Sequence, residues 1–233
     1  MALAASWQRS GECPRRDTGQ DRRHTDVRGV TRVKICGLRD VEAAGAAIES
    51  GADMLGFIFY PPARRYIEPA LVASILDRLP RARVEAVGVF VNATGDEIAE
   101  TARLCHLDLV QLSGDEPPEF IRTLAWPVAR TVHVGPDTTI ADARAIVDGA
   151  RLIHLDAKRP GHYGGTGATF DWAFARAARS LGSVLLAGGL DPGNVASAIA
   201  AADPWGVDVS SGVETDGVKD LVKIEAFLKA VKT

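Results

Sequence analysis

Fold and chemistry meet in the stretch Leu152-Ile153-His154-Leu155-Asp156-Ala157-Lys158-Arg159-Pro160-Gly161-His162-Tyr163-Gly164-Gly165-Thr166-Gly167, where an apolar run ends in one aspartate and enters a glycine-rich, basic loop. A short apolar run bounded by glycine and proline is typical of a buried strand. Backbone N–H groups of such a loop suit an anion. The stretch therefore predicts an acid, Asp156, beside an anion-binding segment that includes Gly165.

The same pattern of a short apolar strand followed by a helical segment repeats from Val33 onward. We expect strands at Val33–Cys36, Met54–Phe59, Glu85–Val91, Leu107–Leu112, Val128–Val134, Leu152–Asp156, Val184–Ala187 and Gly206–Ser210. The spacing of apolar residues predicts helices at Val41–Ser50, Ala70–Leu79, Gly95–Cys105, Thr139–Asp148, Phe170–Arg179, Asn194–Ala202 and Lys219–Val231, and Pro117-Pro118 is expected to open another. About eight such units favour a single (β/α)₈ barrel of the α/β class over an open doubly wound sheet.

Composition limits the kinds of partner. The 233 residues are 46% hydrophobic, which is enough for one sizeable core, and we expect one barrel domain over residues 31–233 after a flexible tail over residues 1–30. A net charge of −3 does not favour binding to nucleic acid or to an anionic membrane surface. Three widely spaced cysteines indicate neither a disulfide framework nor a metal site, and no apolar run is long enough for a membrane span. We therefore expect a cytoplasmic protein with a small-molecule ligand.

Alternation along the first expected strand places Lys34 and Cys36 on one face. A lysine inside a barrel needs a partner, and we expect an ion pair with Asp208, because the last strand closes the barrel beside the first. The alternative is a Lys34 side chain that reaches water. Cys36 ends its strand where the catalytic face begins, so it is a candidate for catalysis, although a buried inert thiol is the commoner fate of a lone cysteine.

On the sixth expected strand, His154 and Asp156 share a face, with Asp156 nearer the loop. Desolvation favours the neutral form of an acid, which suits Asp156 to the role of general acid. His154 is expected to be a packed, hydrogen-bonded histidine. A carboxylate that merely caps a loop is the alternative for Asp156.

Two loops and one arginine suggest how an anionic ligand is held. Phosphate sites in this fold are commonly formed after strands seven and eight, and those segments carry Gly188-Gly189 and Ser211-Gly212. Arg65 follows the second strand in a proline-rich loop, and its planar fork suits a carboxylate. A solvated Arg65 is the alternative. The segment 161–167, with Lys158 and Arg159, can also serve as a lid.

The chain resembles the phosphoribosylanthranilate isomerase family from about Val33 to the C-terminus. The motifs that carry the resemblance are Lys34-Ile35-Cys36-Gly37-Leu38, residues 51–59, Val87-Gly88-Val89-Phe90-Val91-Asn92, residues 107–112, 156–172, 186–195 and 206–212. Their order and spacing along one barrel make the joint signal specific. At the end of the fourth strand the family usually has Val-Gln-Leu-His-Gly, whereas this chain has Ser113 in place of the histidine, so no role is carried over to that position.

The resemblance implies an aldose–ketose isomerase that converts N-(5-phosphoribosyl)anthranilate to 1-(2-carboxyphenylamino)-1-deoxyribulose 5-phosphate in tryptophan biosynthesis, without metal or cofactor, as a monomer or homodimer. It assigns Cys36 as general base and Asp156 as general acid. It places the substrate carboxylate on Arg65 and the phosphate on the loops with Gly188, Gly189, Ser211 and Gly212. Asp208 and Gly165 complete the expected substrate-binding set, and Lys34 and Arg65 are the candidates that activate the thiol.

Two alternatives stay open. One is a bifunctional sugar-phosphate isomerase shared between histidine and tryptophan pathways, which uses two aspartates and against which Cys36 argues. The other is a phosphate-binding barrel without catalysis.

Overall fold

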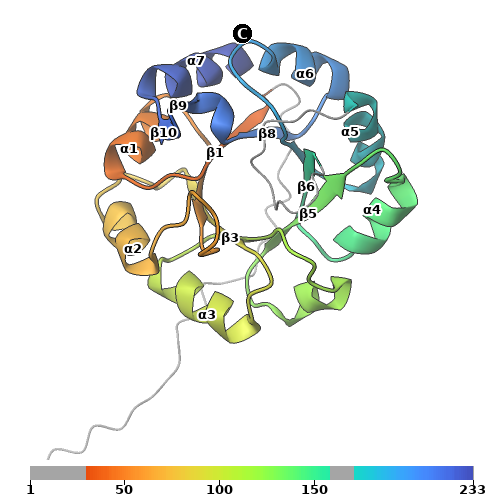
Figure 1. Ribbon diagram of the computed structural model, residues 1–233, viewed down its shortest axis with the longest axis horizontal. Helices are drawn as coiled ribbons and strands as arrows, with labels where there is room; N and C mark the ends of the chain where they lie inside the picture. The colour runs from red at the N-terminus through yellow and green to blue at the C-terminus, as the bar shows by residue number, and fades with distance from the viewer. Residues whose placement is uncertain (1–29, 158–170, 233) are drawn as a thin grey trace, which may run out of the picture. The chain divides into compact units, whose positions relative to one another are not determined.

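Eight parallel strands close into a barrel in the computed structural model, which describes residues 30–157 and 171–232. The strands are β1 (Arg32–Cys36), β2 (Met54–Ile58), β3 (Glu85–Phe90), β4 (Leu109–Leu112), β5 (Val128–Val134), β6 (Leu152–Ala157), β7 (Val184–Leu186) and β8 (Gly206–Val209). They form the inner ring of Figure 1, and β8 pairs with β1 to close it. The predicted (β/α)₈ barrel is confirmed.

Helices surround the strands (Figure 1). They are α1 (Val41–Glu49), α2 (Pro69–Asp77), α3 (Gly95–Leu104), α4 (Ile140–Val147), α5 (Trp172–Ala178), α6 (Val195–Ala202) and α7 (Leu221–Lys232). Several begin at a side-chain cap that satisfies a free backbone N–H: Asp40 caps α1, while Thr94 and Thr139 form capping boxes at α3 and α4. These local signals explain why the helical segments begin so close to the residues expected from the sequence.

The connection between β4 and β5 differs from the expected helix. It contains a six-residue 3₁₀ segment, Pro118–Thr123, in which Ile121 is buried and Phe120 packs partly against the core. Proline at its start is compatible with either helix type, and the segment ends at Leu124 in an extended conformation, so too few residues remain for an α-helix of ordinary length.

The end of the chain also differs from expectation. Lys219, taken as the first residue of the last helix, lies in the two-residue strand β10 (Val218–Lys219), which pairs with β9 (Glu214–Thr215), and α7 begins at Leu221. The turn between the strands, Asp216-Gly217, has positive φ at both residues (51° and 79°), which is the backbone of a tight hairpin. Its consequence is that Glu214 and Lys219 stand opposite each other.

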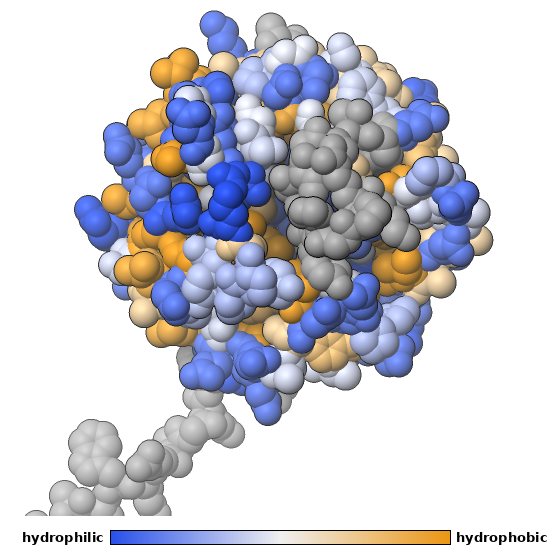
Figure 2. All heavy atoms as spheres, in the orientation of Figure 1, coloured by the Kyte–Doolittle hydropathy of each residue, from blue (hydrophilic) through white to orange (hydrophobic). Residues whose placement is uncertain are grey.

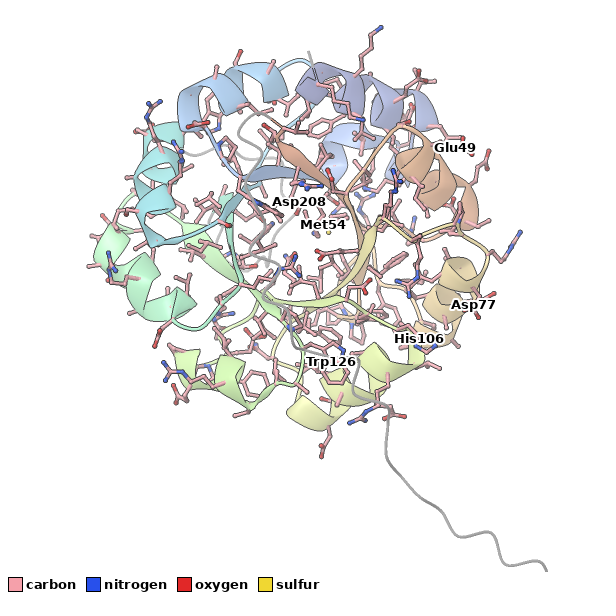
Figure 3. All side chains as sticks on the ribbon, turned by 180° about the vertical axis from the view of Figure 1, so that it is seen from behind. Glu49, Met54, Asp77, His106, Trp126 and Asp208 are labelled. Atoms are coloured by element: carbon pink, nitrogen blue, oxygen red, sulfur yellow. The ribbon has the colours of Figure 1, made fainter. Side chains whose placement is uncertain are left out.

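Inside the barrel, side chains form layers of different chemistry. The floor layer, toward the amino ends of the strands, is an apolar cluster of Met54, Val87, Leu109, Ala129, Leu152 and Leu185. One step further along the strands lies the polar layer, Lys34, Gln111, Thr131, His154 and Asp208, all buried. Figure 3 places Met54 and Asp208 inside the ring, whereas Glu49, Asp77 and His106 lie on its outside. The larger core cluster fills the space between barrel and helices.

No helix among residues 30–157 and 171–232 is both long and apolar enough to cross a membrane. The expected tail over residues 1–30 falls almost entirely outside the described residues.

Candidate active site

Cys36 lies at the carboxyl end of β1 on the same inward face as Lys34, two residues earlier. Both side chains crowd the position of Gly56 on β2, where an added Cβ would lie 3.0 Å from Cys36 Sγ and 3.1 Å from Lys34 Cε. Glycine at this position therefore leaves room for a lysine and a thiol inside the barrel. Cys36 is 7% exposed and Lys34 is fully buried.

The polar layer beneath the thiol is held by one carboxylate. Lys34 Nζ donates to Asp208 Oδ2 at 3.1 Å, and His154 Nε2 lies 2.9 Å from the same oxygen. Thr131 Oγ1 is 3.1 Å from His154 Nδ1, which continues the network across the barrel. The predicted Lys34–Asp208 ion pair and the packed, hydrogen-bonded His154 are confirmed, and Lys34 does not reach water.

This network sets the charge states below the thiol. Burial on its own raises the pKa of Asp208, but Lys34 and His154 more than offset it, so the pKa of Asp208 is lowered. Burial lowers the pKa of Lys34, yet Asp208 and Cys36 raise it by more. The layer therefore carries an ammonium and a carboxylate at neutral pH.

The thiol itself is held in its neutral form. Burial raises the pKa of Cys36 above its ordinary value of 9.0, and Lys34 opposes this shift only in part. Asp208 acts to raise the pKa of Cys36, and Lys219 acts to lower it. Cys36 needs further stabilisation of its anion before it becomes an effective base.

Asp156 lies near the carboxyl end of β6, two residues beyond His154 on the same inward face, and it is 4% exposed. Its Oδ1 accepts a hydrogen bond from the backbone N–H of Ala157 at 2.9 Å. Because Lys34 and His154 both contact Asp208, alternation places Cys36 and Asp156 one layer higher, at the mouth of the same barrel. We call this layer, with Ser113 and His133, the mouth layer.

Arg65 follows β2 and lies against the start of the loop after β1, since a Cβ on Gly37 would collide with its Cδ. Its side chain is only 11% exposed and binds Glu214 through two hydrogen bonds, so it is not a solvated surface arginine. Lys219 Nζ joins the same carboxylate at 3.0 Å. The sequence reasoning missed Glu214 and Lys219, although the Asp216-Gly217 turn signal between them was available.

The two glycine loops meet as expected. Gly188 and Gly189 have φ of 89° and 64° directly after β7, and Gly212 packs so closely on the Leu190 carbonyl that a Cβ would collide with it. Ser211 and Gly212 form a 3₁₀ turn, Ser211–Val213, after β8. The structure thus brings these loops together, whereas Gly165, Lys158 and Arg159 lie outside the described residues.

Within the described residues, no group of three or more His, Cys, Asp or Glu side chains is arranged to hold a metal ion. Cys105, the other buried thiol among residues 30–157 and 171–232, lies at the end of α3, where its Sγ is 3.2 Å from the Pro69 carbonyl oxygen, away from the mouth layer.

Comparisons with known proteins agree with this arrangement. Residues 33–230 match the model of the family described as N-(5'phosphoribosyl)anthranilate (PRA) isomerase. The N-(5'-phosphoribosyl)anthranilate isomerase of Geobacter metallireducens is 44% identical over 204 residues, which cover 87% of this chain and 100% of the relative. The enzyme of that name from Geotalea uraniireducens is 46% identical over the same length, covering 87% and 99%.

Solved structures give the same result. The phosphoribosyl anthranilate isomerase from Thermotoga maritima superposes with a TM-score of 0.80 at 40% identity, covering 87% of this chain and 99% of that one. A phosphoribosyl anthranilate isomerase in complex with reduced 1-(o-carboxyphenylamino)-1-deoxyribulose 5-phosphate gives 0.77 at 39% identity, with the same coverage. Monomers generated from the dimeric Thermotoga maritima enzyme also give 0.77, at 40% identity and the same coverage. The chain belongs to the N-(5'-phosphoribosyl)anthranilate isomerase family of tryptophan-biosynthesis enzymes.

Proposed function

We propose that this chain catalyses the Amadori rearrangement of N-(5-phosphoribosyl)anthranilate to 1-(2-carboxyphenylamino)-1-deoxyribulose 5-phosphate, with Asp156 as general acid and Cys36 as general base. The observation that carries the proposal is the placement of a buried thiol and a buried carboxyl group in one inward-facing layer at the carboxyl ends of β1 and β6. This is the end of a parallel barrel at which catalytic groups are found.

The reaction needs one proton donor and one acceptor. Asp156 gives its proton to the ribose ring oxygen, the C1′–O bond breaks, and the nitrogen lone pair forms a C1′=N iminium. A Cys36 thiolate, formed when the thiol has lost its proton to water, then removes the C2′ proton, and the C–H electrons form a C1′=C2′ double bond while the nitrogen regains its lone pair. The cycle closes when C1′ takes up the thiol proton and the C2′ hydroxyl loses its proton, which restores Asp156.

The thiol is activated in two ways in this scheme. Lys34 lies beside Cys36 and favours its anion permanently. The iminium adds a second positive charge next to the C2′ proton, only after Asp156 has acted. Because burial raises the pKa of the free thiol, we expect its thiolate to be populated mainly after the iminium has formed, when the C2′ proton has also become acidic.

The anchors at the two ends of the substrate follow from charge. We assign the anthranilate carboxylate to Arg65 and the phosphate to backbone N–H groups in the loops with Gly188, Gly189, Ser211 and Gly212. The Gly165 segment remains a proposed part of the phosphate side. Asp208 Oδ1 is buried and has no hydrogen-bond partner among the described residues. We therefore assign it as the acceptor of a hydrogen bond from a ribose hydroxyl of the substrate.

The test follows the loss of anthranilate fluorescence when purified protein meets freshly made N-(5-phosphoribosyl)anthranilate. Wild type and Cys105→Ser, which alters a buried thiol outside the mouth layer, are expected to turn over at similar rates. Cys36→Ser and Asp156→Asn are expected to bind the substrate with little turnover. Unchanged turnover in both of these variants contradicts the assignment, and absence of turnover in the wild type contradicts the reaction.

A further inference from the structure

Glu214 is a buried carboxylate, 6% exposed at its side chain, that binds several cations of the chain. Arg65 Nε donates to its Oε1 at 2.6 Å and Arg65 Nη2 to its Oε2 at 3.0 Å. Lys219 Nζ donates to Oε1 at 3.0 Å, and the half-exposed Arg64 reaches Oε2 at 2.7 Å. One carboxylate thus fixes two partly buried cations, Arg65 and Lys219, beside the loop that follows Cys36.

The way in which Arg65 binds Glu214 leaves half of its fork for a ligand. A guanidinium has one edge made by Nε and Nη2 and another made by Nη1 and Nη2. Glu214 occupies the first edge, and among the described residues no acceptor takes the second. A second carboxylate can therefore bind Arg65 in bidentate fashion without displacing Glu214.

The β9–β10 hairpin is the element that puts Glu214 in place. Glu214 and Lys219 are a cross-strand pair, and Lys219 Nζ also donates to the Ser210 carbonyl oxygen at 2.7 Å. Ser210 Oγ in turn donates to the carbonyl oxygen of Cys36 at 3.1 Å. The cluster is therefore tied to the strand that carries the proposed base.

The charge of the cluster also favours an incoming anion. Arg65, Lys219 and Glu214 together carry one net positive charge in a buried place. Burial on its own raises the pKa of Glu214, but Arg65 and Lys219 lower it by more, to about 2, so the carboxylate stays ionised. Figure 2 shows hydrophilic residues gathered on the part of the face that carries the β9–β10 hairpin in Figure 1.

A second buried pair in the same barrel shows what a purely structural arrangement looks like. Arg130 donates to Glu116 Oε2 at 2.6 Å, and its two terminal nitrogens also donate to the backbone carbonyls of Leu112, Gly114 and Glu116. The chain thus supplies acceptors to both terminal nitrogens of Arg130, and its Nε is the nitrogen without a partner among the described residues. At Arg65 the situation is reversed, since Nε and Nη2 bind Glu214 and no described residue supplies an acceptor to the Nη1–Nη2 edge.

We propose that Glu214 is a positioning residue for the isomerase reaction. It holds Arg65 so that the Nη1–Nη2 edge of the guanidinium faces the benzoate carboxylate of the substrate, and this rests on the role proposed above for Arg65. Glu214 does not itself touch the substrate. Its contribution lies in substrate binding rather than in proton transfer.

The experiment compares Glu214→Gln with the matched control Glu116→Gln, measuring kcat, KM and Tm for each. Glu214→Gln is expected to raise KM roughly tenfold or more while kcat changes little, because misplacing a binding group costs affinity. Glu116→Gln is expected to lower Tm and leave KM unchanged. Glu214→Asp, which keeps the charge but shortens the side chain, gives the same KM signature if Glu214→Gln does not fold.

Combining Glu214→Gln with Arg65→Ala distinguishes failure of the positioning role of Glu214 from failure of the carboxylate-binding role of Arg65. In an Arg65→Ala background, adding Glu214→Gln is expected to change KM by less than about twofold, because the group to be positioned is gone. A substrate analogue without the carboxylate is expected to be insensitive to Glu214→Gln. If Arg65→Ala leaves KM unaltered, the proposed carboxylate site is wrong; if Arg65→Ala raises KM and Glu214→Gln does not, the role of Glu214 alone is wrong.

Discussion

The floor layer and the mouth layer of the barrel interior stand on the same strands but have opposite chemistry. The floor layer consists of apolar side chains that are buried and make no polar contacts, such as Leu109 and Leu152. The mouth layer carries a thiol, a carboxyl group, a hydroxyl and an imidazole above a buried ion pair. The comparison teaches that burial stabilises the fold at one end, while at the other it raises the pKa of a thiol.

The largest expected effect lies in the mouth layer. Cys36→Ser replaces the proposed base with a hydroxyl that scarcely ionises, and we expect kcat to fall by about 10²–10⁴-fold. The free energy of unfolding is expected to change by less than about 1 kcal/mol, because the two side chains have nearly the same volume. Steady-state fluorescence assays and urea denaturation measure the two quantities. A kcat within a factor of two of wild type is the contrary result.

The polar layer, which lies between the floor layer and the mouth layer, is expected to contribute to the stability of the fold as well as to the charge beneath the thiol. Lys34→Met leaves Asp208 buried with His154 but without its ammonium partner, and we expect a loss of about 3–5 kcal/mol in the free energy of unfolding. Urea denaturation measures it. Adding Asp208→Asn to Lys34→Met removes the uncompensated charge and should recover part of the loss. Full stability in the single variant contradicts the importance of this pair.

A floor-layer variant reverses the pattern of Cys36→Ser. Leu109→Ala opens a cavity in the floor layer, and we expect it to cost about 2–5 kcal/mol in the free energy of unfolding. The kcat of the folded fraction is expected to stay near the wild-type value, because the mouth layer lies two layers away. Activity measured well below the melting temperature tests this separation. A large fall in kcat would show that the floor also shapes the chemistry.

The smallest effect concerns the thiol pKa. Since only the thiolate is alkylated, the rate of Cys36 modification by iodoacetamide should rise with pH, with a midpoint above 9.0. Cys105, whose pKa burial raises to about 11, should be modified with a midpoint near that pH. Burial raises this Cys36 midpoint most, Asp208 also raises it, and Lys34 and Lys219 lower it. Peptide mass spectrometry reports each thiol separately, and a Cys36 midpoint near neutrality contradicts the prediction.

Sequence reasoning predicted the barrel and much of the mouth layer because these depend on local periodicity and on strand order. Lys34 and Asp208 were paired correctly because alternation and closure of the barrel are enough to bring them together. Glu214 and Lys219 were missed because the helical pattern was extended back to Lys219, over a hairpin whose only local signal is Asp216-Gly217. The 3₁₀ segment Pro118–Thr123 was overestimated as a helix for a similar reason: its apolar spacing fits either form.

Barrel closure has a consequence for when the protein becomes functional. The partners of Lys34 and of the Cys36 carbonyl lie 174 residues further along the chain, and Glu214 lies 149 residues beyond Arg65. A nascent chain whose last strand is still inside the ribosome has already released Lys34, Cys36 and Arg65. Asp208, the partner of Lys34, and Glu214, the partner of Arg65, are not yet available to it. Turnover by this protein therefore requires the residues from Gly206 onward, about the last eighth of the chain, and a translation product truncated before them is expected to be inactive although it contains the motif of the first strand.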